Sequence, residues 1–280
     1  MLKDIIKTGE GGFFDHVPRT GLICAHRGAR SIAPENTMLA LKTARNCGAH
    51  CWETDVRQAR GGELIIFHDD TLERCTDICA RPGAAALKPW KVESCNLEEL
   101  RRLDAGGWFL ENDPYGTVAE GVAVAGSDGQ QIPLLCEVLE FTAKHRFPVN
   151  LEIKDLHGPE GDDGVVDAVL TMIQETCTMD LVLLSSFRHE YLHRARNLSQ
   201  DIAIAVLAVG QHPPDLINYL KSFAAAAYHP DQELCDDVLM TALGGAGFRV
   251  NSWTVNDMTR AQQMLSAGIG VITDWPQRLV

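Results

Sequence analysis

Residues 22–56, LICAHRGARSIAPENTMLALKTARNCGAHCWETDV, place two short β-rich runs on either side of a helical pattern. The β-rich runs are LICAHR (22–27) and HCWETDV (50–56). Between them, NTMLALKTARNCG carries apolar residues at helical spacing and ends in glycine, which often terminates helices. A strand, a helix and a second strand in this order predict one βαβ unit of a parallel sheet.

The same alternation continues over most of the chain. Two further amphipathic stretches, PLLCEVLEFTAKHR and VNDMTRAQQMLSAG, separate later β-rich runs. Eight such runs with helices between them predict a closed (β/α)₈ TIM barrel. With no internal repeat and no domain boundary in evidence, we expect residues 1–280 to form one domain. The six remaining strand candidates are VNLEIK (149–154), LVLLSSF (181–187), IAIAVLA (202–208), AAAAYH (224–229), RVNSWTV (249–255) and VITDW (271–275).

A ninth apolar run, ELIIFHD (63–69), follows the second strand too soon for a parallel crossover. We expect it to be the return arm of a hairpin that turns at Gly61 and Gly62 and brings His68 near Asp55. Residues from about 70 to 131 are rich in glycine and isolated prolines and lack strong periodicity. They predict an insertion after the second strand that covers the barrel mouth.

The composition limits the classes of binding partner and the cellular compartment that we expect. The chain has 280 residues and a formal net charge of −13, whereas nucleic acids and anionic membranes are normally bound by basic patches. We therefore expect a small-molecule substrate, no nucleic acid and no stable membrane association. Nine scattered cysteines indicate free thiols, and the N-terminus lacks the apolar core of a signal peptide. These features predict a cytoplasmic protein, while the oligomeric state stays open.

Three carboxylates are predicted to meet inside the barrel, where reactive groups sit at the C-terminal ends of strands. Glu53 and Asp55 are two residues apart on one strand and so share a face, and Glu152 lies on the next barrel strand. Such a group repels itself unless a cation holds it, and its oxygen-only ligands favour Mg²⁺ or Ca²⁺. The alternative is a set of structural salt bridges with nearby cations, namely Arg27, Arg57 or Lys154.

Two histidines complete a candidate active site. His26 ends the first strand, and the hairpin delivers His68 to the carboxylates. Phosphodiester hydrolysis needs a base, an acid and cations for the phosphoryl oxygens, which two histidines, Arg27, Lys154 and a metal ion would supply. Either histidine alone is more typical of a hydrogen-bonded structural residue, but the combination favours catalysis.

Six motifs in this order resemble those of the glycerophosphodiester phosphodiesterase family: AHRGARSIAPENT, WETDV, IIFHDDTLERCTD, NLEIK, SWTVN and VITDWP. The resemblance covers residues 22–280. It implies a metal-dependent barrel that cleaves glycerophosphodiesters, such as glycerophosphocholine, into glycerol 3-phosphate and an alcohol. The cofactor implied is one divalent cation, Mg²⁺ or Ca²⁺, with Mn²⁺ also acceptable.

The resemblance implies a role for each of nine residues. His26 and His68 would be the acid and base pair, in an order the sequence leaves open. The other roles are metal binding by Glu53, Asp55 and Glu152, phosphate binding by Arg27 and Lys154, and lining of the glycerol side of the pocket by Trp253 and, as a weaker candidate, Phe187.

Three further polar residues in these motifs have less direct roles. Glu35 and Asn36 are expected to brace the first loop and cap the helix after it. Asp274 suits a turn as well as a site role. The hairpin turn RQARGGEL departs from the family pattern, which predicts altered loop detail with activity retained. Residues 110–131 are where specificity for the alcohol is expected.

Three other functions compete with this interpretation. Residues 189–193, HEYLH, match the HExxH pattern of zinc proteases, but the extension of that motif is missing and a helix surface is the simpler interpretation. A non-catalytic barrel that binds a phosphoryl ligand is disfavoured because every reactive residue is present. A phospholipase-like enzyme acting on intact lipids would favour an apolar or basic rim, which the acidic composition does not suggest.

Overall fold

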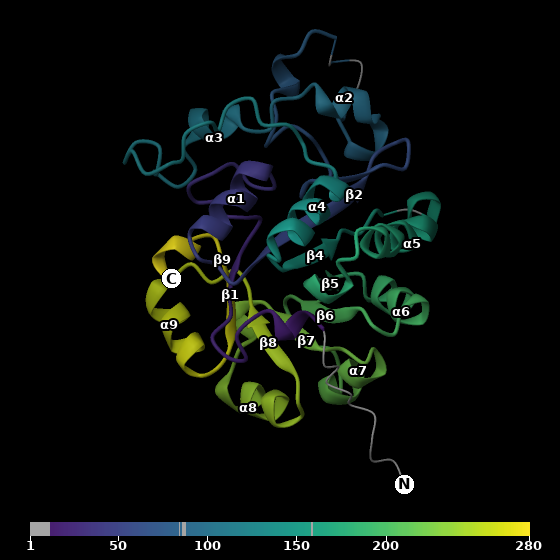
Figure 1. The fold of residues 1–280 in the computed structure, drawn as a ribbon, viewed down its shortest axis with the longest axis vertical. Helices are drawn as coiled ribbons and strands as arrows, with labels where there is room; N and C mark the ends of the chain where they lie inside the picture. Colours follow the sequence, from purple (N-terminus) through teal and green to yellow (C-terminus); the bar gives the residue numbers. More distant parts are fainter. Residues whose placement is uncertain (1–11, 84, 86–87, 158) are drawn as a thin grey trace.

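Eight parallel strands form a closed ring at the centre of the computed structural model, which describes residues 12–83, 85, 88–157 and 159–280 (Figure 1). The first strand pairs with both the second and the last, which closes the ring and confirms the predicted TIM barrel. Every predicted strand is found. The barrel strands are β1 (Ile23–Ala25), β2 (Cys51–Gln58), β4 (Val149–Ile153), β5 (Val182–Ser186), β6 (Ala203–Ala208), β7 (Ala227–Pro230), β8 (Arg249–Ser252) and β9 (Gly270–Thr273).

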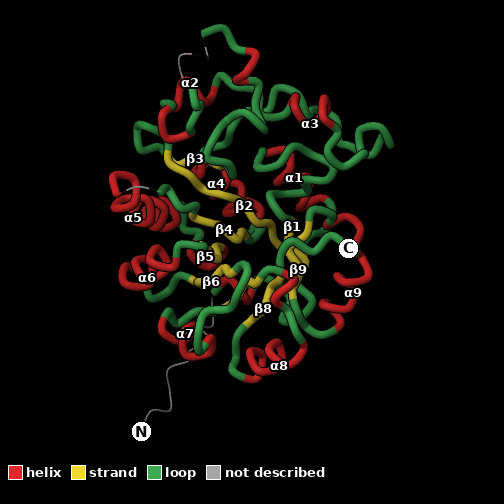
Figure 2. Tube along the Cα trace, turned by 180° about the vertical axis from the view of Figure 1, so that it is seen from behind, coloured by secondary structure: helices red, strands yellow, loops and turns green. Residues whose placement is uncertain are grey.

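Helices surround the ring, as Figures 1 and 2 show. The first is capped at its N-terminus by Thr37, whose side chain accepts a hydrogen bond from the backbone N–H of Ala40. The expectation that Asn36 caps this helix is wrong, because Thr37 takes that place and the Asn36 amide binds Asp55 instead. The outer helices are α1 (Met38–Asn46), α4 (Leu135–His145), α5 (Pro159–Glu175), α6 (His189–Leu198), α7 (Leu216–Ser222), α8 (Asp237–Gly245) and α9 (Met258–Ser266).

The predicted hairpin is present. Strand β3 (Leu64–Ile66) runs antiparallel to β2 and pairs Val56 with Ile66. One residue further, the Phe67 backbone N–H donates to the carbonyl of Asp55 at 2.9 Å. His68 follows directly, so the hairpin brings it back along β2 to Asp55.

The insertion forms a lobe at the end of the molecule away from α7 and α8 (Figures 1 and 2). It has its own apolar cluster, in which Leu72, Trp90 and Leu100 pack against the β3 side chain Ile65. Its two short α-helices are α2 (Leu97–Arg101) and α3 (Gly107–Asn112). The start of α2 carries a capping box of Asn96 and Glu99, a local signal in a segment without strong periodicity.

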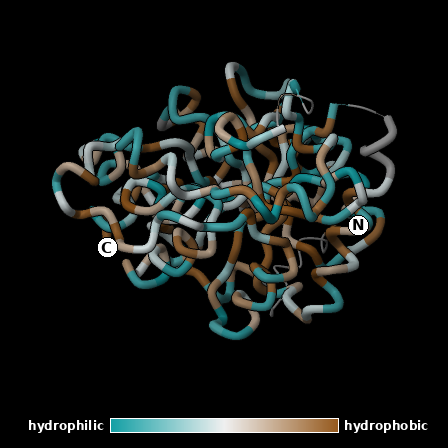
Figure 3. The backbone as a smooth tube through the Cα atoms, turned by 90° about the horizontal axis from the view of Figure 1, so that it is seen from above, coloured by the Kyte–Doolittle hydropathy of each residue, from teal (hydrophilic) through white to brown (hydrophobic). Residues whose placement is uncertain are grey.

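The two ends of the barrel interior differ in polarity. Near the starts of the strands the interior is apolar and includes Cys24, Leu183 and Ile272, with Phe13 buried against them. In Figure 3 hydrophobic stretches gather toward the middle of the trace, while most outer loops are hydrophilic. At the other end of the barrel, His26 and Asp274 directly follow β1 and β9, at the C-terminal ends of the strands, where barrel enzymes carry their active sites.

Within the described residues, no helix combines the length and apolar character needed to cross a membrane. The prediction about a signal peptide rests on residues 1–16, of which residues 1–11 lie outside the described residues.

Two glycine-to-alanine substitutions should have opposite effects on stability. A Cβ on Gly106 would overlap the carbonyl oxygen of Ser127, so Gly106→Ala should lower the free energy of unfolding by about 1–3 kcal/mol. Gly164 is exposed within α5 and has open space around it, so Gly164→Ala should raise stability by about 0.5–1 kcal/mol. Denaturant titration measures both, and equal effects would contradict the close approach of residues 106 and 127.

Candidate active site

Three buried carboxylates lie together on the adjacent strands β2 and β4. Glu53 and Asp55 point from β2, and the parallel register pairs Asp55 with Glu152 of β4. One oxygen of each lies within 4.8 Å of the others, so the trio could hold a metal ion. In the described part of the chain, no other group of three or more His, Cys, Asp or Glu residues meets this criterion.

Hydrogen bonds from the first loop and from β2 orient these carboxylates. The Arg27 backbone N–H donates to Glu53 Oε2 at 2.9 Å, and Asn36 Nδ2 donates to Asp55 Oδ2 at 2.8 Å. The Thr54 hydroxyl donates to Asn36 Oδ1 at 2.7 Å, which fixes the direction of that amide. The Asp55 carboxylate is thus held before any ligand arrives.

Of the three cations considered for structural salt bridges, two reach the trio. Lys154 Nζ lies 2.7 Å from Glu152 Oε1 and 3.5 Å from Asp55 Oδ1. Arg27 Nε lies 3.4 Å from Asp55 Oδ2. Arg57 instead donates to a backbone carbonyl at the end of the hairpin. The salt-bridge interpretation is therefore correct in part, with two positive charges facing three carboxylates.

The electrostatic balance leaves the trio suited to a further cation. Burial, reinforced by repulsion from Asp55 and Glu152, raises the pKa of Glu53 well above its usual range. Burial also raises the pKa of Glu152, although Lys154 opposes it. Burial disfavours the ionised form of Asp55 too, but nearby cations, Lys154 foremost, hold the pKa of Asp55 below its usual range. Asp55 Oδ1 has no hydrogen-bond partner, which fits an oxygen available for a metal ion.

His26 follows β1 and is held by the residue after β9. Its Nδ1 lies 2.7 Å from Asp274 Oδ1, and its Nε2 lies 3.9 Å from Glu53 Oε2. Burial, with a smaller contribution from Arg27, lowers the pKa of His26 to about 4, although Asp274 opposes the shift. The ring therefore has one nitrogen anchored and the other directed at the carboxylates.

His68 has a matching arrangement at the end of the hairpin. Its Nδ1 lies 2.6 Å from Asp69 Oδ1. Arg74 of the insertion donates to both oxygens of Asp69, at 2.6 Å from Nε and 2.9 Å from Nη2. Burial disfavours ionisation of Asp69, but His68 and Arg74 outweigh it and hold the pKa of Asp69 below its usual range.

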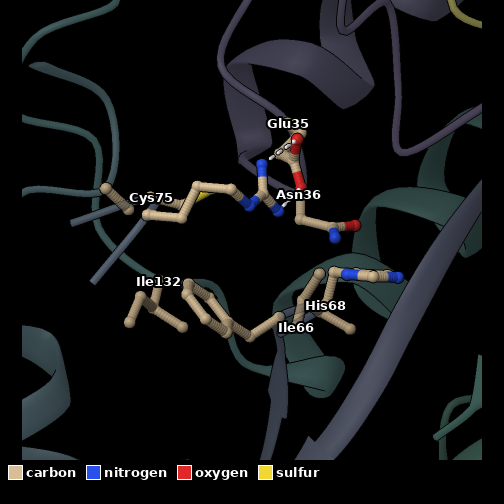
Figure 4. A pocket seen from close by; sticks show the side chains of 9 residues that line it. Glu35, Asn36, Ile66, His68, Cys75 and Ile132 are labelled. Carbon is tan, nitrogen blue, oxygen red and sulfur yellow. Dashed lines mark hydrogen bonds and ion pairs between the residues drawn. The ribbon is translucent and has the colours of Figure 1, made fainter. Parts of the chain in front are cut away.

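Glu35 joins three arginines and closes the network between the two histidines. It accepts hydrogen bonds from Arg27 at 2.9 Å, from Arg30 at 2.6 Å and from Arg74 at 2.7 and 3.0 Å. Burial disfavours its charge, but these arginines hold the pKa of Glu35 well below its usual range. Figure 4 shows Glu35 facing His68 across a small pocket. The contacts confirm the expected bracing role of Glu35.

Two aromatic residues lie together at the same end of the barrel. Phe187 follows β5 and Trp253 follows β8, and their rings meet edge to face with centroids 5.3 Å apart. Trp253 Nε1 donates to the carbonyl of His229 at 2.8 Å, which fixes the indole. Phe187 is one of the exposed large apolar side chains of the described residues.

The HExxH residues have ordinary helix contacts. His189 Nδ1 lies 2.7 Å from the Tyr219 hydroxyl, and its Nε2 lies 2.8 Å from the Leu207 carbonyl. His193 is exposed and stacks on Phe223. Both ring nitrogens of His189 are thus occupied, as expected for a residue of the helix surface.

Four residues of the network were absent from the predicted site or left undecided. Asp69 stands next to His68 in the sequence, and Asp274 lies in the TDWP motif, so local signals existed for both. Arg74 lies in the IIFHDDTLERCTD motif, so a signal existed for it as well. Tyr115, whose hydroxyl donates to Asp274 Oδ2, belongs to the insertion and had no such signal.

Comparisons with known proteins identify the family of this chain. The model of the glycerophosphoryl diester phosphodiesterase family matches residues 26–278. The chain belongs to this family. A glycerophosphodiester phosphodiesterase of Bacillus altitudinis is 34% identical over 263 residues, covering 92% of this chain and 96% of the relative. Another, from Caldanaerobacter subterraneus, is 30% identical over 261 residues, with the same coverage of both chains.

Solved structures of the family share the fold. An Oleispira antarctica phosphodiesterase, 28% identical, superposes with a TM-score of 0.79 and covers 96% of this chain and 97% of its own. That structure is a complex with the product sn-glycerol-3-phosphate.

Because the HExxH histidines lie on α6, His189→Ala and His193→Ala should each retain near-normal phosphodiesterase turnover per folded molecule. The His189 change removes two hydrogen bonds, so it should lower the melting temperature more than the exposed His193 change does. Steady-state assays and metal analysis check both. If either variant lost both its turnover and a stoichiometric zinc ion, the HExxH residues would be a functional zinc site.

Proposed function

We propose that this chain hydrolyses water-soluble glycerophosphodiesters to glycerol 3-phosphate and an alcohol, with one divalent cation held by Glu53, Asp55 and Glu152. The observation that carries the proposal is this buried carboxylate trio with two aspartate-held histidines beside it. Family membership and the relatives at 30–34% identity support the reaction class. The Oleispira complex supports glycerol 3-phosphate as one product.

The metal ion in this proposal is Mg²⁺ or Ca²⁺, with Mn²⁺ acceptable, because the ligand set consists of carboxylate oxygens. When bound, it would neutralise the charge of the phosphoryl oxygens. Asp55 Oδ1, which accepts no hydrogen bond, and the close approach of the three carboxylates support this ligand set. Arg27 and Lys154, which reach the same carboxylates, bind the remaining phosphate charge.

His26 and His68 are the proton-transfer pair of this proposal. Each has its Nδ1 beside an aspartate oxygen, which fixes the ring and leaves Nε2 for the substrate. One histidine takes the proton from the attacking water and the other gives a proton to the leaving alkoxide. Trp253 and Phe187 line the glycerol side of the pocket in this arrangement.

The remaining parts of the proposal concern the domain organisation and the cellular location of the chain. A single domain that includes the insertion is supported by the insertion side chains Arg74 and Tyr115, which contact the site. A cytoplasmic location is supported by the nine cysteines, all of which are free. Comparing glycerophosphocholine with a lipid emulsion, with and without chelator, distinguishes this function from a phospholipase and from a non-catalytic barrel.

Metal dependence gives the first test. Chelation should abolish turnover, and Mg²⁺, Ca²⁺ or Mn²⁺ should restore it. Glu53→Gln and Glu152→Gln each remove one anionic ligand at similar size and should weaken metal affinity by more than about tenfold. Calorimetric titration of chelator-treated protein measures that affinity.

The matched control is Glu98→Gln, the same chemical change at an exposed glutamate of α2, which should leave metal binding unchanged. Full turnover in exhaustively metal-free protein would disprove the role of the trio.

The histidine pair gives the second test. His26→Ala and His68→Ala should each lower kcat by about a hundredfold to ten-thousandfold, with a smaller effect on KM. The double variant should be only slightly worse than the poorer single variant, because each proton transfer depends on the other. A nitrophenyl diester, whose leaving group needs no proton, should rescue only the variant that lacks the acid.

His193→Ala serves as the histidine control. If both active-site variants keep more than about a tenth of wild-type kcat on the natural diester, the two-histidine mechanism is wrong.

A further inference from the structure

Tyr115 reaches from the insertion to the carboxylate that holds His26. It lies in the segment after α3, 159 positions before its partner, and its hydroxyl donates to Asp274 Oδ2 at 3.1 Å. The phenol is partly buried, and burial raises the pKa of Tyr115, so its hydroxyl stays protonated and acts as a donor.

The two oxygens of Asp274 have different tasks. Oδ1 faces His26 Nδ1 at 2.7 Å, whereas Oδ2 accepts from Tyr115 and from Asn256 Nδ2 at 2.8 Å. Two donors on Oδ2 fix the plane of the carboxylate, and that plane fixes the direction of the bond to His26. The orientation of the imidazole therefore depends on both donors.

Arg30 lies close enough to compete with His26 for the Asp274 carboxylate. Its Nη1 lies 3.7 Å from Asp274 Oδ1 and 3.5 Å from His26 Nδ1, so it is a competing partner for the same oxygen. If Oδ2 loses one donor, the carboxylate gains freedom to turn toward the arginine and away from the histidine. The Tyr115 hydroxyl opposes that rotation.

The position of Tyr115 is itself well defined. Its ring packs edge to face on Trp275 with centroids 5.6 Å apart. Two residues after Tyr115, the buried Thr117 hydroxyl donates to the Ser31 carbonyl at 2.6 Å. Later in the same segment, the Val124 backbone N–H donates to the Ile32 carbonyl at 2.8 Å. The segment is therefore attached to the first loop of the barrel independently of the phenol hydroxyl.

We propose that Tyr115 is a positioning residue for His26, acting through Asp274, so that the insertion takes part in proton transfer during diester hydrolysis. The inference rests on the proposed function, since it assigns His26 to proton transfer. Tyr115 does not need to touch the substrate for this role. Its loss should therefore change kcat and leave KM nearly unaffected.

The test is Tyr115→Phe, which removes the hydroxyl and keeps the ring on Trp275. It should lower kcat on glycerophosphocholine by about three- to tenfold, the range expected for one lost hydrogen bond, with KM and melting temperature nearly unchanged. Thr117→Val is the matched control, because it removes an anchor of the same segment and leaves Asp274 untouched. Its turnover per folded molecule should stay within about twofold of wild type.

A double-mutant cycle with Asp274→Asn tests the route of the effect. If Tyr115 acts through Asp274, the double variant should be no slower than Asp274→Asn alone. An additive loss, a change in KM without a change in kcat, or equal effects of Tyr115→Phe and Thr117→Val would each overturn the inference. Wild-type protein inactive on every diester would instead disprove the proposed function, so the two failures are distinguishable.

Discussion

The mutual repulsion of three buried carboxylates is the constraint on which the rest of this site depends. Ionised groups away from water require compensation, and here two cationic side chains from neighbouring strand ends supply part of it. Lys154 directly follows β4, the strand that carries Glu152, and Arg27 lies in the first loop. A divalent cation would supply the charge that these two side chains do not.

Arg27, which contacts the carboxylate trio, also binds Glu35, and Glu35 links the trio to a wider network of charged side chains. Glu35 binds three arginines, one of which also holds the aspartate beside His68. Another, Arg30, approaches the aspartate beside His26. The two histidines are therefore joined by one continuous set of charged contacts, and a change at one is expected to be felt at the other.

The sequence predicts this structure well wherever the signal is local or periodic. Strand positions follow from apolar runs, and the turn at Gly61 and Gly62 sets the hairpin register that delivers His68. The same reasoning misplaced the helix cap by one residue, because Asn36 and Thr37 are both good capping residues and only the position of Asp55 decides between them. The bond of Tyr115 to Asp274 and that of Arg74 to Glu35 could not be predicted, since these partners come from distant segments and depend on how the insertion folds back.

Closure of the barrel between β1 and β9 determines when the site can form during synthesis of the chain. His26 lies 248 positions before the aspartate that orients it, Asp274, so the histidine is synthesised well before its partner. On the ribosome the growing chain therefore carries the carboxylates and both histidines long before the ring closes. A nascent chain therefore cannot assemble a competent site until β9 and Asp274 have emerged, and the site stays incomplete while the barrel is open.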